Sequence, residues 1–120
     1  MTPREEASLA EANSVRQETY LAYLKGMYQF RQETREADRC GIEILEEVVR
    51  QDPSSALAHA GVAYGYAHLA HSPFPGNAYP KAKSAADIAL RLNPELAEAH
   101  LAVGMSGGEF YCYNLILPLN

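Results

Sequence analysis

Apolar side chains recur along most of the chain at intervals of three and four residues, the spacing that places them on one face of an α-helix. The pattern predicts helices over 20–31, 34–50, 56–69 and 78–92, and a shorter fifth helix after Pro94. The apolar stripes of the first four helices are, in chain order, Leu21, Leu24 and Tyr28; Ala37, Gly41, Ile44, Leu45 and Val48; Val62, Tyr66 and Leu69; and Ala82, Ala85, Ala86, Ala89 and Leu92. The sequence therefore predicts an all-α fold.

An internal repeat marks the boundaries between these helices. The segments that begin at Pro53 and Pro94 share alanine, histidine and valine residues at a constant offset of 41, among them His59 and His100. The residue before a proline avoids the helical region of backbone space, so one helix ends before each of these prolines. The predicted helices thus form hairpins, and a longer loop over 71–77 connects the second pair.

Two regions lie outside the repeat. Residues 1–15 are charged and rich in alanine, which fits either a helical extension or a disordered segment. After Gly107 and Gly108 the chain becomes apolar without helical periodicity, so residues 106–120 are predicted to form an extended, strand-like tail. The repeat-bearing domain is therefore residues 16–105.

These features resemble the tetratricopeptide repeat (TPR) family, whose motif of about 34 residues combines small and bulky apolar positions with a proline near its end. The likeness covers about residues 20–104 and is carried by Ala22-Tyr-Leu-Lys-Gly26, Ala58-His-Ala-Gly-Val-Ala63, Tyr79-Pro-Lys-Ala-Lys83 and Leu96-Ala-Glu-Ala-His100. These stretches look most like the repeat arrays of bacterial regulatory proteins, which often follow winged-helix, adenylate-cyclase or serine/threonine-kinase domains. The resemblance implies a TPR-like α-α superhelix of antiparallel hairpins, here with about 2.5 repeats.

The departures from the family concern particular positions and the last repeat. His59 and His100 stand where the family favours tryptophan, and the third repeat has only its first helix. A solenoid normally needs a polar cap over its last apolar face. The tail 106–120 is either a substitute for that cap or the mark of a truncated reading frame, and the apolar stretch from Phe110 to Leu119 favours truncation.

The resemblance also implies a concave groove lined by the first helix of each hairpin, where a peptide or helix would bind. The positions of this partner-binding groove are Tyr23, Met27, Leu57, Ala60, Tyr64, His68, Glu98 and Leu101. Tyrosine and methionine suit such a surface because they offer a large contact area with a polar or adaptable end. For Tyr23 and Tyr64 a place in the groove and a place in the core are equally supported, whereas Tyr28 and Tyr66 are expected to cap the core.

Some members of the family bind the carboxylate of a peptide C-terminus with cationic residues on these helices. The matching positions here hold Tyr23, Met27, Gly61, Glu98 and Ala102, so that kind of carboxylate clamp is not expected. An apolar or tyrosine-mediated contact is the alternative that the residues support.

Composition and charge exclude several classes of protein. The formal net charge is −5 and no cluster of lysine and arginine is present, which argues against binding to nucleic acid. Cys40 and Cys112 are far apart, so a reducing, cytoplasmic compartment is expected. Residues 1–18 lack the apolar core of a secretion signal, and the longest apolar stretch, 115–119, is too short to span a membrane.

Candidate chemistry is sparse. His68 and His71 share a helix face, but no cysteine or carboxylate close in sequence completes a metal site. His59 and His100 are interpreted as core residues of the repeat. No phosphate loop or nucleophile motif is present, and Glu46 and Glu47 are interpreted, with Arg50, as a solvated helix face. We therefore expect no metal, no cofactor and no enzymatic activity.

The sequence predicts a module for protein–protein interaction, with a regulatory or scaffolding role, that holds a peptide or helix in its groove. The alternative is a self-associating repeat fragment of a larger bacterial regulator, which would form a dimer through its uncapped third helix and the tail 106–120.

Overall fold

The structure of the chain, a computed structural model, describes residues 2–71 and 76–106 and contains five α-helices in that part. They are α1 (Pro3–Phe30), α2 (Arg35–Gln51), α3 (Ala56–Ala70), α4 (Ala78–Leu92) and α5 (Ala97–Ser106). Every regular element of the described residues is helical, so the all-α prediction is confirmed. The predicted strand-like tail lies, apart from Ser106 at the end of α5, outside the described residues.

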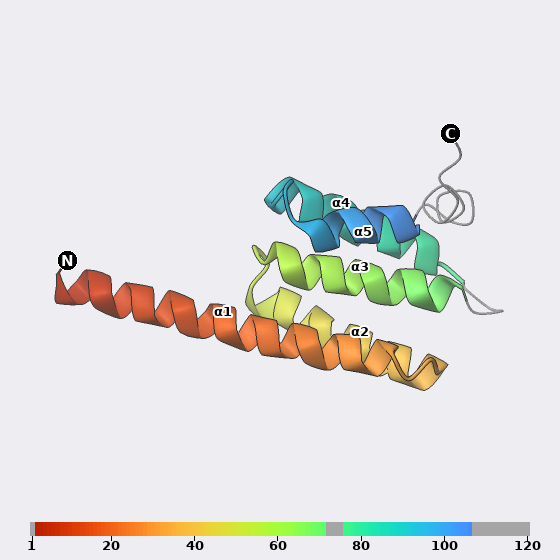
Figure 1. Cartoon of the computed structure of the whole chain (residues 1–120), viewed down its shortest axis with the longest axis horizontal. Coiled ribbons are helices and arrows are strands. Elements are labelled where there is room, and N and C mark those ends of the chain that lie inside the picture. The colour runs from red at the N-terminus through yellow and green to blue at the C-terminus, as the bar shows by residue number, and fades with distance from the viewer. Residues whose placement is uncertain (1, 72–75, 107–120) are drawn as a thin grey trace.

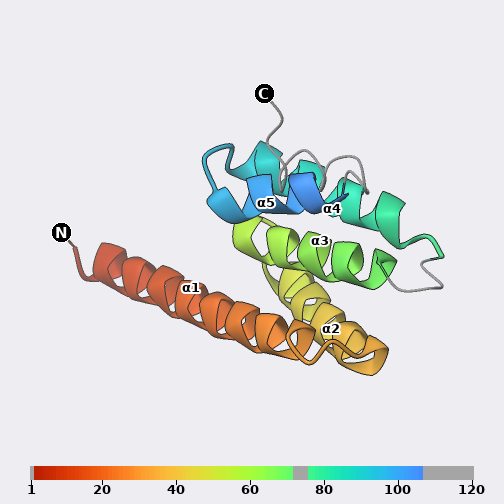
Figure 2. The ribbon, with the colours of Figure 1, turned by 45° about the vertical axis from the view of Figure 1, so that its right-hand side comes forward.

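Consecutive helices run in opposite directions and form two layers (Figure 1). One layer contains α1, α3 and α5, and the other contains α2 and α4, as a second view also shows (Figure 2). Helix α3 lies at the centre and contacts all four of the other helices. In the described part of the chain, α2 and α4 make no close backbone contact with each other.

Helix α1 is longer than the sequence pattern predicted. It begins at Pro3, whereas the sequence pattern predicts a start near Tyr20; of the two alternatives for residues 1–15, a helical extension or a disordered segment, the structure shows helix from Pro3 onward. The N-cap is Thr2, whose Oγ1 accepts a hydrogen bond from the backbone N–H of Glu5 at 3.2 Å, and Pro3 follows at a position where its missing N–H costs nothing. The N-terminal half of α1 projects beyond the other four helices (Figure 1).

The turns before α3 and α5 repeat one hydrogen bond. Nε2 of His59 lies 2.9 Å from the backbone oxygen of Pro53, and Nε2 of His100 lies 2.6 Å from that of Pro94. Each ring is thus tied to the turn in front of its own helix. His59 is buried as predicted, but His100 is exposed, so its interpretation as a core residue was wrong. The two sites differ because α3 is enclosed by helices on both sides, whereas α5 contacts only α3 and α4 in the described chain.

The core between α1, α2 and α3 depends on four glycines around two large side chains. Leu45 and Phe30 are the largest fully buried residues. A Cβ on Gly26 or Gly61 would lie less than 3 Å from Leu45, and a Cβ on Gly41 or Gly65 would lie 2.5 Å from the ring of Phe30. These glycine contacts come from all three helices. The absence of side chains at the four positions lets the helices approach closely enough to enclose Leu45 and Phe30.

The interface between α3 and α4 is built differently, from alanine on both sides. The fully buried alanines are Ala58, Ala63 and Ala67 on α3 and Ala82, Ala86 and Ala89 on α4. The predicted alanine stripe of α4 is confirmed, but Leu92 at its end is 42% exposed. On α2 the buried isoleucine is Ile42, while the predicted Ile44 is only half-buried.

The predicted apolar stripe of α1 was wrong. Leu21, Leu24 and Tyr28 are 58%, 45% and 63% exposed, and Tyr28 therefore does not cap the core. The helix buries Gly26 and Phe30 on its other side. The physical reason is that the glycine permits a closer approach to α2 than a leucine face would, a preference that hydrophobic periodicity does not register.

Substitution of Gly41 tests the close approach of α1 and α2. In Gly41→Ala the new Cβ would lie 2.5 Å from Cε1 of Phe30 and 2.9 Å from the backbone oxygen of Gly26. Because that oxygen belongs to a helix backbone, it cannot move aside cheaply. We expect the free energy of unfolding to fall by about 1–3 kcal/mol from overpacking, despite a gain in helix propensity of up to about 1 kcal/mol.

Chemical denaturation measures this change. The matched control is Cys40→Ala, one residue earlier on the exposed side of α2, which is expected to change stability by less than about 0.5 kcal/mol. A Gly41→Ala variant as stable as this control would show that the helices do not approach as closely as described.

Candidate functional site

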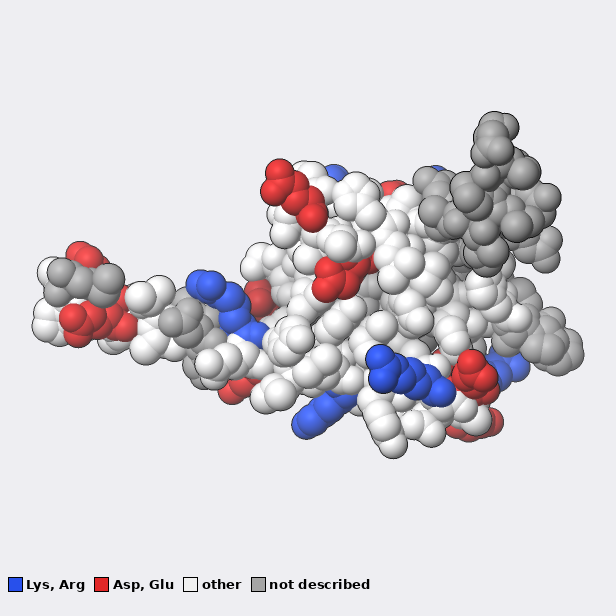
Figure 3. All heavy atoms as spheres, viewed as in Figure 1, with Lys and Arg blue, Asp and Glu red and all other residues white. Residues whose placement is uncertain are grey.

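The face formed by α1, α3 and α5 is uncharged over its middle, and acidic and basic side chains lie along α1 and near α5 (Figure 3). The predicted groove residues lie on these three helices, with Tyr23 and Met27 on α1, Glu98 and Leu101 on α5, and the remaining four on α3. Ala60 is the exception to their surface position. It is 1% exposed and packs against Ala89 and Ala99, so it contributes to the core and not to a groove. At that point α3 faces α4 and α5, which leaves no room for a ligand.

Three aromatic rings form an aromatic centre between α1 and α3. Phe30 and Tyr64 have ring centroids 5.7 Å apart, and Tyr64 and His68 lie 6.2 Å apart with their planes inclined by only 11°. Phe30 is buried beneath the other two rings. Tyr64 and His68 are partly buried, so each offers one part of its ring to the core and another part to the surface.

Tyr23 connects this centre to α5. Its Cδ2 lies 3.2 Å from a Cβ built on Gly61, so the ring rests against the small-residue face of α3. Burial raises the pKa of the Tyr23 phenol above its usual value, and the nearby charge of Glu98 raises it further, followed by smaller effects of Tyr64 and Tyr20. Tyr23 of α1 therefore packs on α3, and Glu98 of α5 is near enough to influence its phenol electrostatically.

The carboxylate that holds His68 comes from a distant part of the chain. Nδ1 of His68 lies 2.9 Å from Oδ1 of Asp38, a buried residue in the first turn of α2. A carboxylate oxygen accepts, so Nδ1 is the donor and the ring orientation is fixed. An aspartate at a position that helical periodicity assigns to the buried face was the only available signal, since the two residues are 30 positions apart.

His71 does not join His68 in a common site. Its Nδ1 lies 3.1 Å from the hydroxyl of Tyr79 on α4, and the two rings meet edge to face. Over the residues described, no three histidine, cysteine or acidic side chains come close enough together to hold a metal ion.

A cavity of about 1280 Å³ adjoins this surface at the end where α3 and α5 begin. It lies between α1 and the turns at Asp52–Ala56 and Leu92–Leu96, and its apolar lining includes Tyr20, Leu21, Leu57, Leu92 and Leu96. Only Leu57 had been predicted as a groove residue. Leu92 and Leu96 flank the turn at Pro94, and this pair of leucines around a proline is the feature of the sequence that indicates the cavity.

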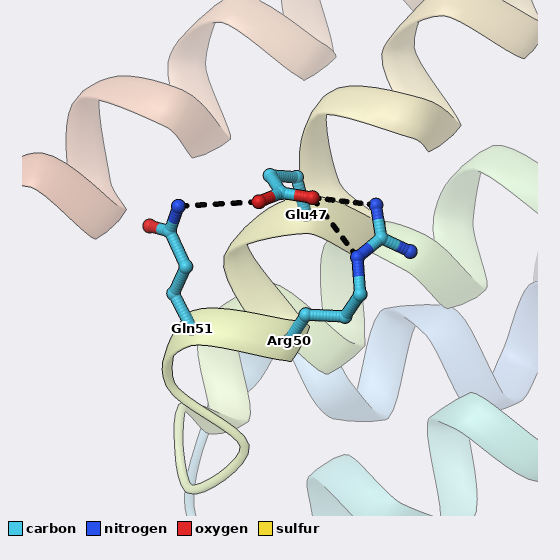
Figure 4. Close-up of polar contacts among 3 residues, drawn as sticks. All are labelled: Glu47, Arg50 and Gln51. Atoms are coloured by element: carbon cyan, nitrogen blue, oxygen red, sulfur yellow. Dashed lines mark hydrogen bonds and ion pairs between the residues drawn. The ribbon is translucent and has the colours of Figure 1, made fainter.

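The neighbouring glutamates Glu46 and Glu47 of α2 have different partners. Glu47 accepts two hydrogen bonds from Arg50, at 2.9 and 2.6 Å, and one from Gln51 at 3.2 Å (Figure 4). These bonds lower the pKa of the exposed Glu47, as is usual for a surface ion pair. Glu46 instead accepts a bond of 3.3 Å from the hydroxyl of Tyr66, whose pKa is raised first by burial and then by this carboxylate.

No helix within the described residues combines the length and the apolar character needed to cross a lipid bilayer. No protein-family model matches the chain, and no significant match was found among curated proteins or solved structures. The likeness to tetratricopeptide repeats accordingly rests on the residue pattern and remains a prediction.

Alkaline titration tests the environment of Tyr23. Because the pKa of its phenol is raised above 10.0, the folded state favours the neutral form. The stability that the folded state gains from the neutral Tyr23 phenol is complete below pH 10 and is lost as the pH rises through the raised pKa. The reason is that Tyr23 releases its proton at lower pH in the unfolded chain than in the folded one. We expect the free energy of unfolding to fall less steeply above pH 10 in Tyr23→Phe than in the wild-type chain.

The control is Tyr28→Phe, which removes a hydroxyl from a side chain that is 63% exposed and is expected to leave the steepness unchanged. Some alkaline loss should persist in Tyr23→Phe, because Tyr66 also has a raised pKa. Identical slopes for wild type and Tyr23→Phe, measured by denaturation at several pH values, would contradict the described packing.

Proposed function

We propose that the chain is a protein-interaction module that binds a segment of another protein on the surface of α1, α3 and α5. The observation that carries this proposal is the pair of half-buried tyrosines on neighbouring helices, Tyr23 on α1, packed against α3, and Tyr64 on α3. Aromatic side chains with one solvent-exposed edge are typical anchors of protein interfaces. The cavity at Leu57 extends the same surface and offers room for an apolar side chain of the partner.

A TPR-like superhelix is part of the proposal. Two features support it: α1, α3 and α5 are in serial contact as the first helices of successive hairpins would be, and the histidine-to-proline bond recurs at the same offset as the sequence repeat. In such arrays the first helices line the binding surface. The regulatory or scaffolding role, the bacterial origin and the cytoplasmic location follow from the resemblance and the cysteine usage, and are proposed with it.

The charges on this surface favour one kind of partner segment. Glu98 is half-buried in the first turn of α5 beside Tyr23, and the described residues provide no salt bridge to it. A basic side chain of the partner would neutralise this carboxylate while lying against tyrosine rings, an arrangement that attracts cations. We therefore propose a partner segment that combines large apolar side chains with lysine or arginine.

The alternative function is self-association through α5 and the tail. Leu101 on α5 is 51% exposed, which leaves an apolar contact available there. The remainder of that proposed interface, residues 107–120, lies outside the described part of the chain.

Peptide selection tests the groove directly. Purified protein is used to select binders from a random peptide library, and the affinities of the best peptides are measured by calorimetry or fluorescence anisotropy. Leu57→Ala combined with Tyr64→Ala removes two large contact surfaces and is expected to weaken binding about tenfold or more. Glu98→Gln is expected to weaken peptides that carry lysine or arginine and to spare uncharged ones.

The matched control is Ser84→Ala on the exposed side of α4, in the opposite layer of helices, which should retain full affinity. Circular dichroism establishes that each variant is folded. If the Leu57 and Tyr64 substitutions left the affinity of every selected peptide unchanged, the groove would not be the binding surface.

A further inference from the structure

His68 on α3 has two ring nitrogens, and the fold engages only one of them in the described chain. Nδ1 lies 2.9 Å from Oδ1 of Asp38, whose side chain is 7% exposed. In a neutral imidazole one nitrogen donates and the other accepts, so donation from Nδ1 to the carboxylate leaves Nε2 as an acceptor. Within residues 2–71 and 76–106, no hydrogen bond to Nε2 of His68 is present.

The shape of the ring directs Nε2 away from Asp38. The two nitrogens of an imidazole flank one ring carbon, so a ring that points Nδ1 at a carboxylate points Nε2 nearly the opposite way. Asp38 is buried on α2, in the other layer of helices, whereas 27% of the His68 side chain is exposed. Nε2 is therefore the nitrogen that a ligand on the surface of α3 can reach.

Two further aromatic rings hold His68 in this orientation. It stacks on Tyr64, one turn earlier on α3, and its centroid lies 6.5 Å from that of Phe30 on α1. A flip of the imidazole would replace Nδ1 by a carbon beside Asp38 and leave a buried carboxylate oxygen without its donor, which is costly. The position of Nε2 on the helix is thus fixed before any partner arrives.

Asp38 also improves Nε2 as an acceptor. A carboxylate that accepts a hydrogen bond from one imidazole nitrogen raises the basicity of the other, as is well known for histidines that ligate metals. The described residues bring no third histidine, cysteine or acidic side chain close enough to complete a metal site with this pair. The strengthened acceptor is therefore suited to a hydrogen-bond donor of a bound segment.

We propose that His68 determines the specificity of the groove, and that its Nε2 accepts a hydrogen bond from a hydroxyl, amide or indole group of the partner segment. This role rests on the proposed function, because it places His68 in the same groove as Tyr64. Asp38 does not touch the partner and acts as a positioning residue that keeps the proton on Nδ1. An apolar side chain opposite Nε2 would desolvate this acceptor without a bond, and a carboxylate would be repelled.

Nitrogen NMR of the His68 ring tests the tautomer on the wild-type chain. At mildly alkaline pH, where imidazole side chains are neutral, Nε2 is expected to show the chemical shift of an unprotonated ring nitrogen and Nδ1 that of a protonated one. In Asp38→Ala the two shifts are expected to move toward those of a histidine with mixed tautomers. A protonated Nε2 in the neutral wild-type ring would overturn the proposal, because no acceptor would then face the partner.

A double-mutant cycle tests the contact with the partner. Peptides are selected on the wild-type chain, and the donor that the best binders share is removed with little change of shape, threonine to valine or tyrosine to phenylalanine. His68→Asn removes Nε2 but keeps an amide that can donate to Asp38. We expect His68→Asn to weaken the donor-bearing peptide about three- to tenfold more than the donor-free one. His68→Gln, whose amide oxygen lies near the position of Nε2, is expected to restore part of this difference.

The control is His71→Asn, the same substitution at the next histidine of the chain. Its Nδ1 lies beside the hydroxyl of Tyr79, and the change is expected to leave the affinity of both peptides unaltered. Circular dichroism establishes that each variant is folded.

The outcomes separate this role of His68 from the groove itself. Additive losses in the cycle, or selected peptides with no shared donor, would overturn the role of His68 and leave the groove standing, provided that Leu57→Ala with Tyr64→Ala still weakens binding. If that double substitution had no effect, or if no peptide were selected, the groove would fail and the contact at His68 with it.

Discussion

The packing of α1, α2 and α3 depends on one steric constraint, the absence of side chains at Gly26, Gly41, Gly61 and Gly65. Leu45 and Phe30 occupy the space that four Cβ atoms would otherwise fill. This arrangement fixes how α1 is rotated about its axis, because only its glycine side can approach α2. The rotation then decides which residues of α1 face α3, Tyr23 among them. The place of Tyr23 in the proposed groove therefore follows from the same set of contacts.

Helix positions were largely predictable from the sequence, but the burial of particular faces was not. The prolines at 53 and 94 mark the turns correctly, since their effect on the preceding residue is local. The buried side of α1 was predicted wrongly because hydrophobic periodicity counts leucine as an apolar position and does not count glycine. On a helix where close approach governs packing, Leu21 and Leu24 remain outside while Gly26 is buried.

For the candidate site, too, the helix that carries each residue was predictable, but the burial and contacts of particular side chains were not. Family resemblance placed Tyr23, Tyr64 and Glu98 on the first helices of successive hairpins, and these residues lie on α1, α3 and α5. Ala60 was assigned to the groove although it is buried, because position along a repeat does not report local crowding by α4 and α5. Asp38 and the cavity residues Leu92 and Leu96 were missed, since their roles depend on contacts between residues far apart in the chain.

The bond from each histidine to its proline carbonyl has a consequence for how the fold is assembled. It joins residues only six positions apart, so closing this small loop costs little chain entropy and needs no distant part of the molecule. Each turn can therefore form early, as an independent local nucleus, before the helices on either side have docked. A fold whose turns are each stabilised locally can gain or lose a hairpin by duplication or deletion between two turns without disturbing the turns that remain.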